Sequence, residues 1–306
     1  MNFIKQIGIQ NRTFIRKYHI TSFNCCKSNP VNLAYNSYEN VDDQNEGSNE
    51  GAVVIMHGLF GSKQNWKSIC KALSQKSNPK RKIIALDARN HGESPHVQSH
   101  TYIDLAEDVR HFFEQNSITK SVCIGHSMGG RAMMCFALKY PELVDRAIIV
   151  DVSPVRSSPS LIGMGGIFAA MTTVNIPATM KMSEGRSLAN EQLMDAIPSK
   201  ETRDFVLMNL VKGADGRFSW RANVEALHQN FNDHISTFPE SLAGKQYHGP
   251  VLFLAGSKSD YIKKGDLDGI KTIFPNSDLK FIDSGHLVHV ERPYEFLDLV
   301  LKFINH

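Results

Sequence analysis

The sequence lacks any run of eighteen uninterrupted apolar residues, which is the length a helix needs to span a lipid bilayer. Its apolar patch at residues 161–171 is too short and is broken by glycines. The net charge is only +3, so we expect no basic face large enough to hold nucleic acid. With 42% hydrophobic and 21% charged residues among 306, the composition predicts a soluble globular protein without integral membrane association.

Cysteine is scarce, and the sequence contains five cysteines, an odd number. Cys123 and Cys135 fall within apolar strand and helix patterns. We therefore expect buried free thiols in a reducing compartment rather than a disulfide framework. Neither a G-x-x-x-x-G-K-[ST] nor a G-x-G-x-x-G sequence is present, so no nucleotide cofactor is predicted.

Acidic residues are absent from the first 38 positions, where basic residues alternate with apolar ones. A basic amphipathic leader of this kind is typical of a mitochondrial transit peptide, and it is too polar for a secretion signal. We predict a transit peptide over residues 1–30 and a location in the mitochondrial matrix. The basic residues are Lys5, Arg12, Arg16, Lys17 and Lys27.

Six short apolar segments alternate with helical patterns from residue 52 onward, after an alternating segment at 31–38 and a polar loop at 39–51. Apolar strands separated by helices indicate a mostly parallel sheet with helices on both faces. The predicted strands are residues 52–57, 82–87, 121–125, 146–151, 250–256 and 278–283.

Helical patterns occupy residues 66–75, 102–115 and 128–140, and a last helix begins at Pro293. The alternation of strand and helix is interrupted once, because residues 153–249 show helical patterns and no convincing buried strand. We interpret this segment as an inserted helical cap. The predicted core is then divided into residues 31–152 and 250–306.

The strongest motif is Gly125-His126-Ser127-Met128-Gly129, a G-x-S-x-G sequence between a predicted strand and a predicted helix. The turn that joins them is so tight that the residues two before and two after the serine must be small. It would project the Ser127 hydroxyl from the carboxyl edge of the sheet. The motif in this setting predicts the α/β-hydrolase fold, with Ser127 as the nucleophile.

Two backbone N–H groups should stabilise the oxyanion that forms when the serine attacks a carbonyl. One is that of Met128, at the start of the helix after the nucleophile. The other should come from the loop after the first strong strand, where Leu59 is our first choice and Phe60 the alternative. His57, which begins this loop, is expected to be a structural hydrogen-bonding residue.

A serine hydroxyl needs a base that accepts its proton and returns it to the leaving group. His286 follows the last predicted strand and can swing over the sheet edge, and the order with serine first and histidine last matches this fold. His289 is a competitor deeper in an apolar run. The pair has no evident third ligand, so no metal site is predicted.

The acid that orients the histidine has more than one candidate in the sequence. In most enzymes of this fold it stands three residues beyond the glycine that ends the strand at 250–256, and this place is taken by Ser259. Asp260 comes one residue later and fits only if the turn is shifted. Asp151 ends the strand at 146–151, and we prefer it, with Asp260 as the alternative and Glu225 in the cap as a remote third candidate.

The segment 87–94 is rich in charged and turn-forming residues. We expect Asp87 and Arg89 to fix the loops beside the oxyanion strand rather than to bind a metal or a phosphate.

From about residue 31 to its end, the sequence resembles the family of mitochondrial α/β-hydrolase-domain-containing protein 11 and its bacterial YbfF-type esterase relatives. The similar stretches are HGLFGSKQNW, LDARNHGESPH, GHSMGGRAM, VDVSPV, DGRFSWRANVEAL and SGHLVHVERP. The resemblance implies a capped serine esterase of the mitochondrial matrix, active without a cofactor on simple esters and on acyl thioesters such as acyl-CoA. It also implies an acid after the strand that precedes the cap, which supports Asp151, although some family assignments favour the position of Glu225. Asp260 departs from the family, where a non-acidic residue is usual.

The function predicted from these features is that of a serine esterase or thioesterase on carboxylic esters, including acyl-CoA or lipid esters. Its partner is a small-molecule ester or thioester, and a mitochondrial protein is a further candidate partner. Two rival hypotheses remain: a pseudo-hydrolase that only binds a ligand or a protein, and a carbon–carbon bond hydrolase on the same fold. The apolar cap residues expected to line an acyl pocket, or else to form the cap core, are Met164, Phe168, Met171, Phe218 and Trp220.

Overall fold

The computed structural model describes residues 29–39 and 51–305. The predicted transit peptide therefore lies outside the described residues, apart from its last two positions. Within the described ranges, no helix is both long and apolar enough to cross a bilayer.

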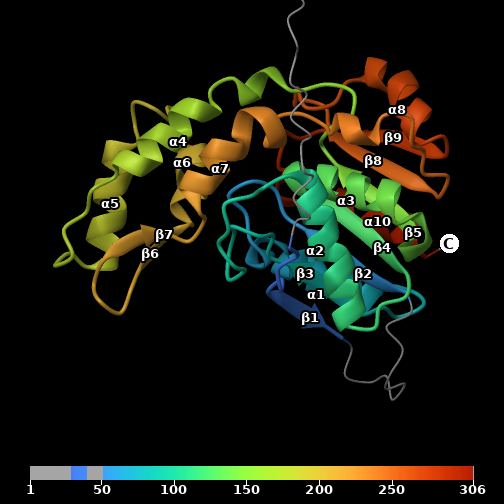
Figure 1. The fold of residues 1–306 in the computed structure, drawn as a ribbon, viewed down its shortest axis with the longest axis horizontal. Coiled ribbons are helices and arrows are strands. Elements are labelled where there is room, and N and C mark those ends of the chain that lie inside the picture. The colour runs from blue at the N-terminus through green and yellow to red at the C-terminus, as the bar shows by residue number, and fades with distance from the viewer. Residues whose placement is uncertain (1–28, 40–50, 306) are drawn as a thin grey trace, which may run out of the picture.

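A seven-stranded sheet forms the centre of the fold, in the order β1-β3-β2-β4-β5-β8-β9 (Figure 1). Strand β1 pairs antiparallel with β3, and the other neighbours are parallel. Each of the six predicted strands is present, with ends within two residues of those predicted. The strands are β1 (Tyr35–Tyr38), β2 (Ala52–Met56), β3 (Ile83–Leu86), β4 (Ser121–His126), β5 (Val144–Val150), β8 (Val251–Gly256) and β9 (Ser277–Ile282).

Helices cover both faces of the sheet, and every residue of β2, β3, β4 and β8 is buried as a result. Apolar residues of α1 and α10 pack on one face, and those of α2, α3 and α8 pack on the other. These helices are α1 (Lys67–Lys76), α2 (Tyr102–Gln115), α3 (Met128–Lys139), α8 (Leu267–Ile273) and α10 (Pro293–Ile304), and a short helix α9 (Val288–Glu291) precedes the last. The fold is therefore an α/β-hydrolase fold, as predicted.

A cap lies between β5 and β8 and stands to one side of the sheet (left in Figure 1). It contains the expected helices, but also a two-stranded antiparallel hairpin that the sequence analysis missed. Each of its strands has only three residues, too few to show a period of two. The cap elements are α4 (Met164–Thr173), α5 (Met182–Gln192), α6 (Lys200–Leu207), β6 (Leu210–Lys212), β7 (Phe218–Trp220) and α7 (Val224–Asn230).

The sheet order determines where a site can form. Strands β2, β4, β5, β8 and β9 are neighbours and run parallel, so the loops after their carboxyl ends meet at one edge of the sheet. Ser127 follows β4, Asp151 follows β5 and His286 lies in the loop after β9. The topology thus places the three predicted catalytic residues at the same edge.

The three cysteines within the described residues, Cys70, Cys123 and Cys135, are free and buried, as expected. Burial raises the pKa of the Cys70 and Cys123 thiols to about 12, so these side chains stay protonated.

Candidate active site

Ser127 lies between β4 and α3 at a turn whose backbone has φ 53° and ψ −117°. A positive φ is strained for a residue with a side chain. A Cβ atom on Gly125 would lie 2.2 Å from the carbonyl oxygen of Gly129, and one on Gly129 would lie 2.4 Å from that of Met56. Both positions therefore require glycine, as the motif predicted, and the turn presents Ser127 at the wall of a cavity.

His286 and Asp151 are brought together by the loops after β9 and β5. Nδ1 of His286 donates to Oδ2 of Asp151 at 2.7 Å, and the Asp151 side chain is completely buried. The same carboxylate accepts hydrogen bonds from the backbone N–H of Gly256, at 2.8 Å, and from the Ser259 hydroxyl. The opposite ring nitrogen of His286 forms no hydrogen bond within the described residues, and the ring lines the same cavity as Ser127.

The two alternative acids do not reach the histidine. The Asp260 carboxylate accepts from the Ser158 hydroxyl and from the N–H and hydroxyl of Ser160, so it is tied to the start of the cap. Burial alone would raise the pKa of Asp260, but these hydrogen bonds lower it below its ordinary value. Glu225 is exposed in the first turn of α7, where it accepts a hydrogen bond from Gln229.

The N–H of Leu59, in the loop after β2, is oriented by hydrogen bonds to the Gly58 carbonyl of the same peptide unit. The Gly58 carbonyl accepts hydrogen bonds from the Gly61 N–H at 2.9 Å and from Nδ1 of His57 at 2.8 Å. The N–H of Leu59 belongs to the same peptide unit, and in a trans peptide the N–H points away from the C=O. A Cβ on Gly58 would lie 3.2 Å from Cβ of Ser127, so this peptide lies directly beside the nucleophile.

The backbone N–H of Phe60, the alternative oxyanion donor, already forms a hydrogen bond within the protein. Its N–H donates to Nε2 of His91 at 3.2 Å, and its own backbone has φ 59°. The Phe60 N–H is therefore already occupied in this structure, which favours Leu59 as the donor. Sequence reasoning missed His91, which is buried and lies 31 positions away.

Met128 is the first residue of α3 and lines the cavity beside Ser127. The first N–H groups of a helix have no acceptor within the helix, and the helix dipole favours negative charge near them. The Met128 N–H thus lies at the start of α3, directly after Ser127, and the Leu59 N–H lies in the loop after β2.

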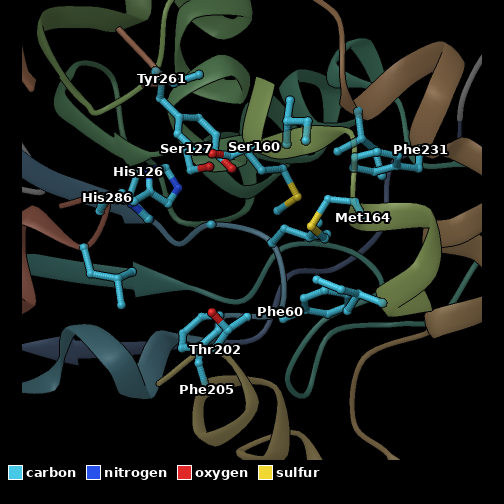
Figure 2. Close-up of a pocket in the computed structure, with 18 of the residues that line it drawn as sticks. Phe60, His126, Ser127, Ser160, Met164, Thr202, Phe205, Phe231, Tyr261 and His286 are labelled. Atoms are coloured by element: carbon cyan, nitrogen blue, oxygen red, sulfur yellow. Dashed lines mark hydrogen bonds between the residues drawn. The ribbon is translucent and has the colours of Figure 1, made fainter. Parts of the chain in front are cut away.

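A cavity of about 420 Å³ separates this sheet edge from the cap (Figure 2). Most of its wall is apolar, and the cap contributes Leu161, Met164, Ile167, Phe205, Phe231 and Ile235. Of the five predicted pocket residues only Met164 lines it. Phe168 and Met171 are buried in the cap core, and Phe218 and Trp220 pack against that core.

Three further side chains at the site carried no signal in the sequence. The Tyr261 ring stacks on His286 with centroids 3.8 Å apart, and Nε2 of His126 bonds to the His286 backbone carbonyl at 2.9 Å. Both contacts hold the histidine loop in place. Arg131, on α3, is buried and also lines the cavity.

The two other candidate histidines, His57 and His289, make contacts that hold the structure together. Nε2 of His57 accepts from the Ala88 N–H at 3.1 Å, so its proton is on Nδ1, where it serves the Gly58 carbonyl. His289 stacks on Trp66 with ring centroids 4.1 Å apart. Burial lowers the pKa of both rings, that of His289 to about 3, so both stay neutral.

Asp87 and Arg89 hold the loops beside the oxyanion strand, as expected. Asp87 accepts from the backbone N–H groups of Lys63 and Glu93 and pairs with the buried Lys63 ammonium. Arg89 forms a two-point ion pair with Asp108, each contact 2.6 Å long. Across residues 29–39 and 51–305, no three His, Cys, Asp or Glu side chains are grouped as a metal site would require.

A strained serine turn and a histidine bound to a buried carboxylate, all at the carboxyl ends of strands of one parallel sheet, are features of α/β hydrolases. Residues 51–293 match the family model described as alpha/beta hydrolase fold. A mouse protein named sn-1-specific diacylglycerol lipase ABHD11 is 39% identical over 254 residues, which cover 83% of this chain and 80% of that protein. The chain belongs to the ABHD11 family of α/β hydrolases, and it is an ester hydrolase.

Two other similarities agree with this assignment. The solved structure titled "Marine microorganism esterase" matches with a TM-score of 0.78 and 30% sequence identity, covering 89% of this chain and 99% of that one. A Hanseniaspora uvarum protein named ethanol acetyltransferase 1 is 32% identical over 84% of this chain and 80% of its own length.

Proposed function

We propose that the protein is a serine esterase and thioesterase that works through an acyl-serine intermediate, with Ser127, His286 and Asp151 as its catalytic triad. The observation that carries the proposal is the 2.7 Å contact between His286 and the buried Asp151, in a cavity that Ser127 also lines. The buried carboxylate fixes the ring tautomer, so that the free nitrogen of His286 can serve as a base.

In the first half of the reaction, Ser127 attacks the substrate carbonyl while His286 takes the hydroxyl proton. The N–H groups of Leu59 and Met128 hold the oxyanion, and His286 then passes the proton to the leaving group. In the second half, His286 activates a water molecule, which releases the acid from Ser127. Asp151 holds the ring tautomer and stabilises the charged imidazole in both halves.

The cavity and the relatives both indicate the substrate class. An apolar wall from the cap suits the acyl part of an ester, because burying its methylene groups is favourable. The mouse relative is named for diacylglycerol, so we include lipid esters. Thioesters such as acyl-CoA are included because they present the same electrophilic carbonyl to Ser127.

Labelling with a fluorophosphonate, followed by peptide mapping, tests the nucleophile. The label should sit on Ser127, and Ser127→Ala should lose both labelling and hydrolysis of p-nitrophenyl esters while circular dichroism stays unchanged. A wild-type protein that takes no label would favour the pseudo-hydrolase. Products of carbon–carbon cleavage, with no ester turnover, would favour the other rival.

We also propose import into the mitochondrial matrix, directed by residues 1–30, with a mitochondrial protein as a further partner. The proposal rests on the basic, acid-free composition of the leader. A fluorescent reporter fused to residues 1–30 should enter mitochondria. A reporter in which Arg12, Arg16 and Lys17 are replaced by glutamate is the matched control and should remain in the cytosol.

A further inference from the structure

Arg131 places a positive charge in the wall of the Ser127 cavity. Arg131 is only 3% exposed, and an arginine side chain carries a positive charge. Within the described residues no carboxylate lies within ion-pair distance of Arg131, whereas the buried cations Lys63 and Arg89 each pair with a buried aspartate. Glu201 also lines the cavity, but it is exposed and forms no ion pair with Arg131. Within the described residues, the guanidinium therefore has no carboxylate in direct contact.

The hydrogen bonds of Arg131 explain its position but not its charge. Its guanidinium donates to the backbone carbonyls of Ile235 at 3.1 Å, Arg156 at 3.0 Å and Ser153 at 3.5 Å, and its Nε is buried without a partner. A neutral amide could serve such carbonyls with a smaller desolvation cost than a buried cation. An anion that enters the cavity would give the guanidinium the partner it lacks.

The position of Arg131 indicates which part of a substrate would meet it. His286 passes its proton to the leaving group, so the leaving group must lie beside His286. A second cavity of about 450 Å³ is lined by Leu287, His289 and Val290, which follow His286, and not by Arg131. The two cavities share Gly58, His126 and Leu287 in their walls. A leaving group beside His286 would then point toward the second cavity, and the acyl part would point toward Arg131.

Helix geometry gives the distance that an acyl chain must span between Ser127 and Arg131. Arg131 comes four residues after Ser127, and its N–H donates to the Ser127 carbonyl, so the two residues are about 6 Å apart along α3. Ile235, which accepts from Arg131, lies in a π-helical turn with Phe231. In the view of Figure 2, Phe231 lies on the far side of Ser127 from His286. A short acyl chain that leaves Ser127 in this direction would bring its far end to the guanidinium.

We propose that the preferred substrate carries a free carboxylate at the far end of a short acyl chain, so that it is a half-ester or half-thioester of a dicarboxylic acid. This inference rests on the serine-esterase function proposed above. The carboxylate pairs with Arg131, while the ester carbonyl lies at Ser127. Esters of neutral acids enter the same cavity but forgo the ion pair.

The test compares two ethyl esters whose acyl chains have the same number of carbons, monoethyl glutarate and ethyl pentanoate. The full-length protein should hydrolyse monoethyl glutarate with a kcat/KM about tenfold higher or more, as expected for a charged hydrogen bond. Free glutarate should inhibit hydrolysis of p-nitrophenyl butyrate competitively, at concentrations where pentanoate does not. Arg131→Met should reverse the preference between the two esters, and Arg131→Lys should retain part of it.

Arg203 offers a matched control, because it is a second buried arginine that donates to backbone carbonyls, at Ile197 and Pro198, but does not line the cavity. Arg203→Met should lower stability without changing the ratio of the two kcat/KM values. If Arg131→Met fails to fold, Arg131→Lys and glutarate inhibition of the wild type decide the question.

The inference is overturned if the wild type shows no preference for monoethyl glutarate, or if the preference survives in Arg131→Met. In either case turnover of ethyl pentanoate and fluorophosphonate labelling of Ser127 would leave the proposed esterase intact. If neither ester is hydrolysed and Ser127 takes no label, the proposed function fails and this inference fails with it.

Discussion

The Ser259 hydroxyl donates a hydrogen bond to Oδ2 of Asp151, the same oxygen that accepts from His286. Ser259 occupies the place after β8 where most enzymes of this fold carry the orienting acid. In the triad proposed here the acid is Asp151, at the end of the neighbouring strand β5, and the usual position supplies a donor to it instead. The carboxylate therefore receives hydrogen bonds from both His286 and Ser259, which fixes its orientation.

We predict that Asp151→Asn lowers kcat by about a thousandfold or more, because the amide no longer fixes the His286 tautomer or stabilises the imidazolium. Asp260→Asn should change kcat only a few-fold, since Asp260 bonds to Ser158 and Ser160 and not to His286. The measurement is steady-state hydrolysis of a p-nitrophenyl ester, with circular dichroism to exclude misfolding. The reverse ranking of the two variants would assign the role to Asp260.

Much of the fold could be predicted from the sequence, because buried parallel strands are apolar throughout and because G-x-S-x-G has a characteristic setting. The composition of the cap was less informative. Helix α4 is apolar on all sides, so its sequence does not tell a cavity face from a core face. Met164 faces the cavity, but Phe168 packs inside the cap against Phe60 and Phe231.

The site was predictable only where chemistry limits the residue type. Ser127 has a motif, and His286 has a place in the chain order. The choice between Asp151 and Asp260 depends on which strand end faces the histidine, and that is a distance between loops separated by more than a hundred residues. Arg131 and Tyr261 have no motif, since their significance comes entirely from the cavity they line.

A second prediction concerns Asn209, which lies in the cap between α6 and β6. Its buried side-chain amide donates to the Phe60 carbonyl at 2.7 Å, while the Phe60 N–H is held by His91. Phe60 directly follows Leu59, the proposed oxyanion donor. We predict that Asn209→Leu lowers kcat about tenfold with little change in KM, well short of the loss of about 10²–10³ when a donor is removed outright.

The readout for Asn209 is the separation of kcat from KM, together with the affinity for a transition-state analogue such as a boronic acid, which should weaken in parallel with kcat. The matched control is Asn223→Ala, because Asn223 also joins the cap to the core, through Asn90, but does not touch the oxyanion loop. Equal effects of the two variants on kcat would show that the cap contact acts only through overall stability.

The last prediction follows from the buried neutral histidines. Burial lowers the pKa of His91 and of His289 to about 3, whereas an unfolded chain binds these protons near pH 6.5. Between these values the unfolded state binds more protons than the folded state, so stability must fall as the pH is lowered from about 6.5 toward 3. Each such histidine contributes at most about 1.4 kcal/mol per pH unit.

His289→Phe isolates one of these contributions, because a phenyl ring can keep the stack on Trp66 while it removes both the titrating group and a buried Nδ1 that has no partner within the described residues. Urea unfolding at pH 7.5 and at pH 5 should show a smaller loss of stability on acidification for the variant, by about 1–2 kcal/mol. The pH-dependent difference is the decisive quantity, since the exchange of imidazole for phenyl shifts stability by a constant amount at both pH values. Equal losses in the two proteins would mean that His289 takes up a proton in the folded state over this range.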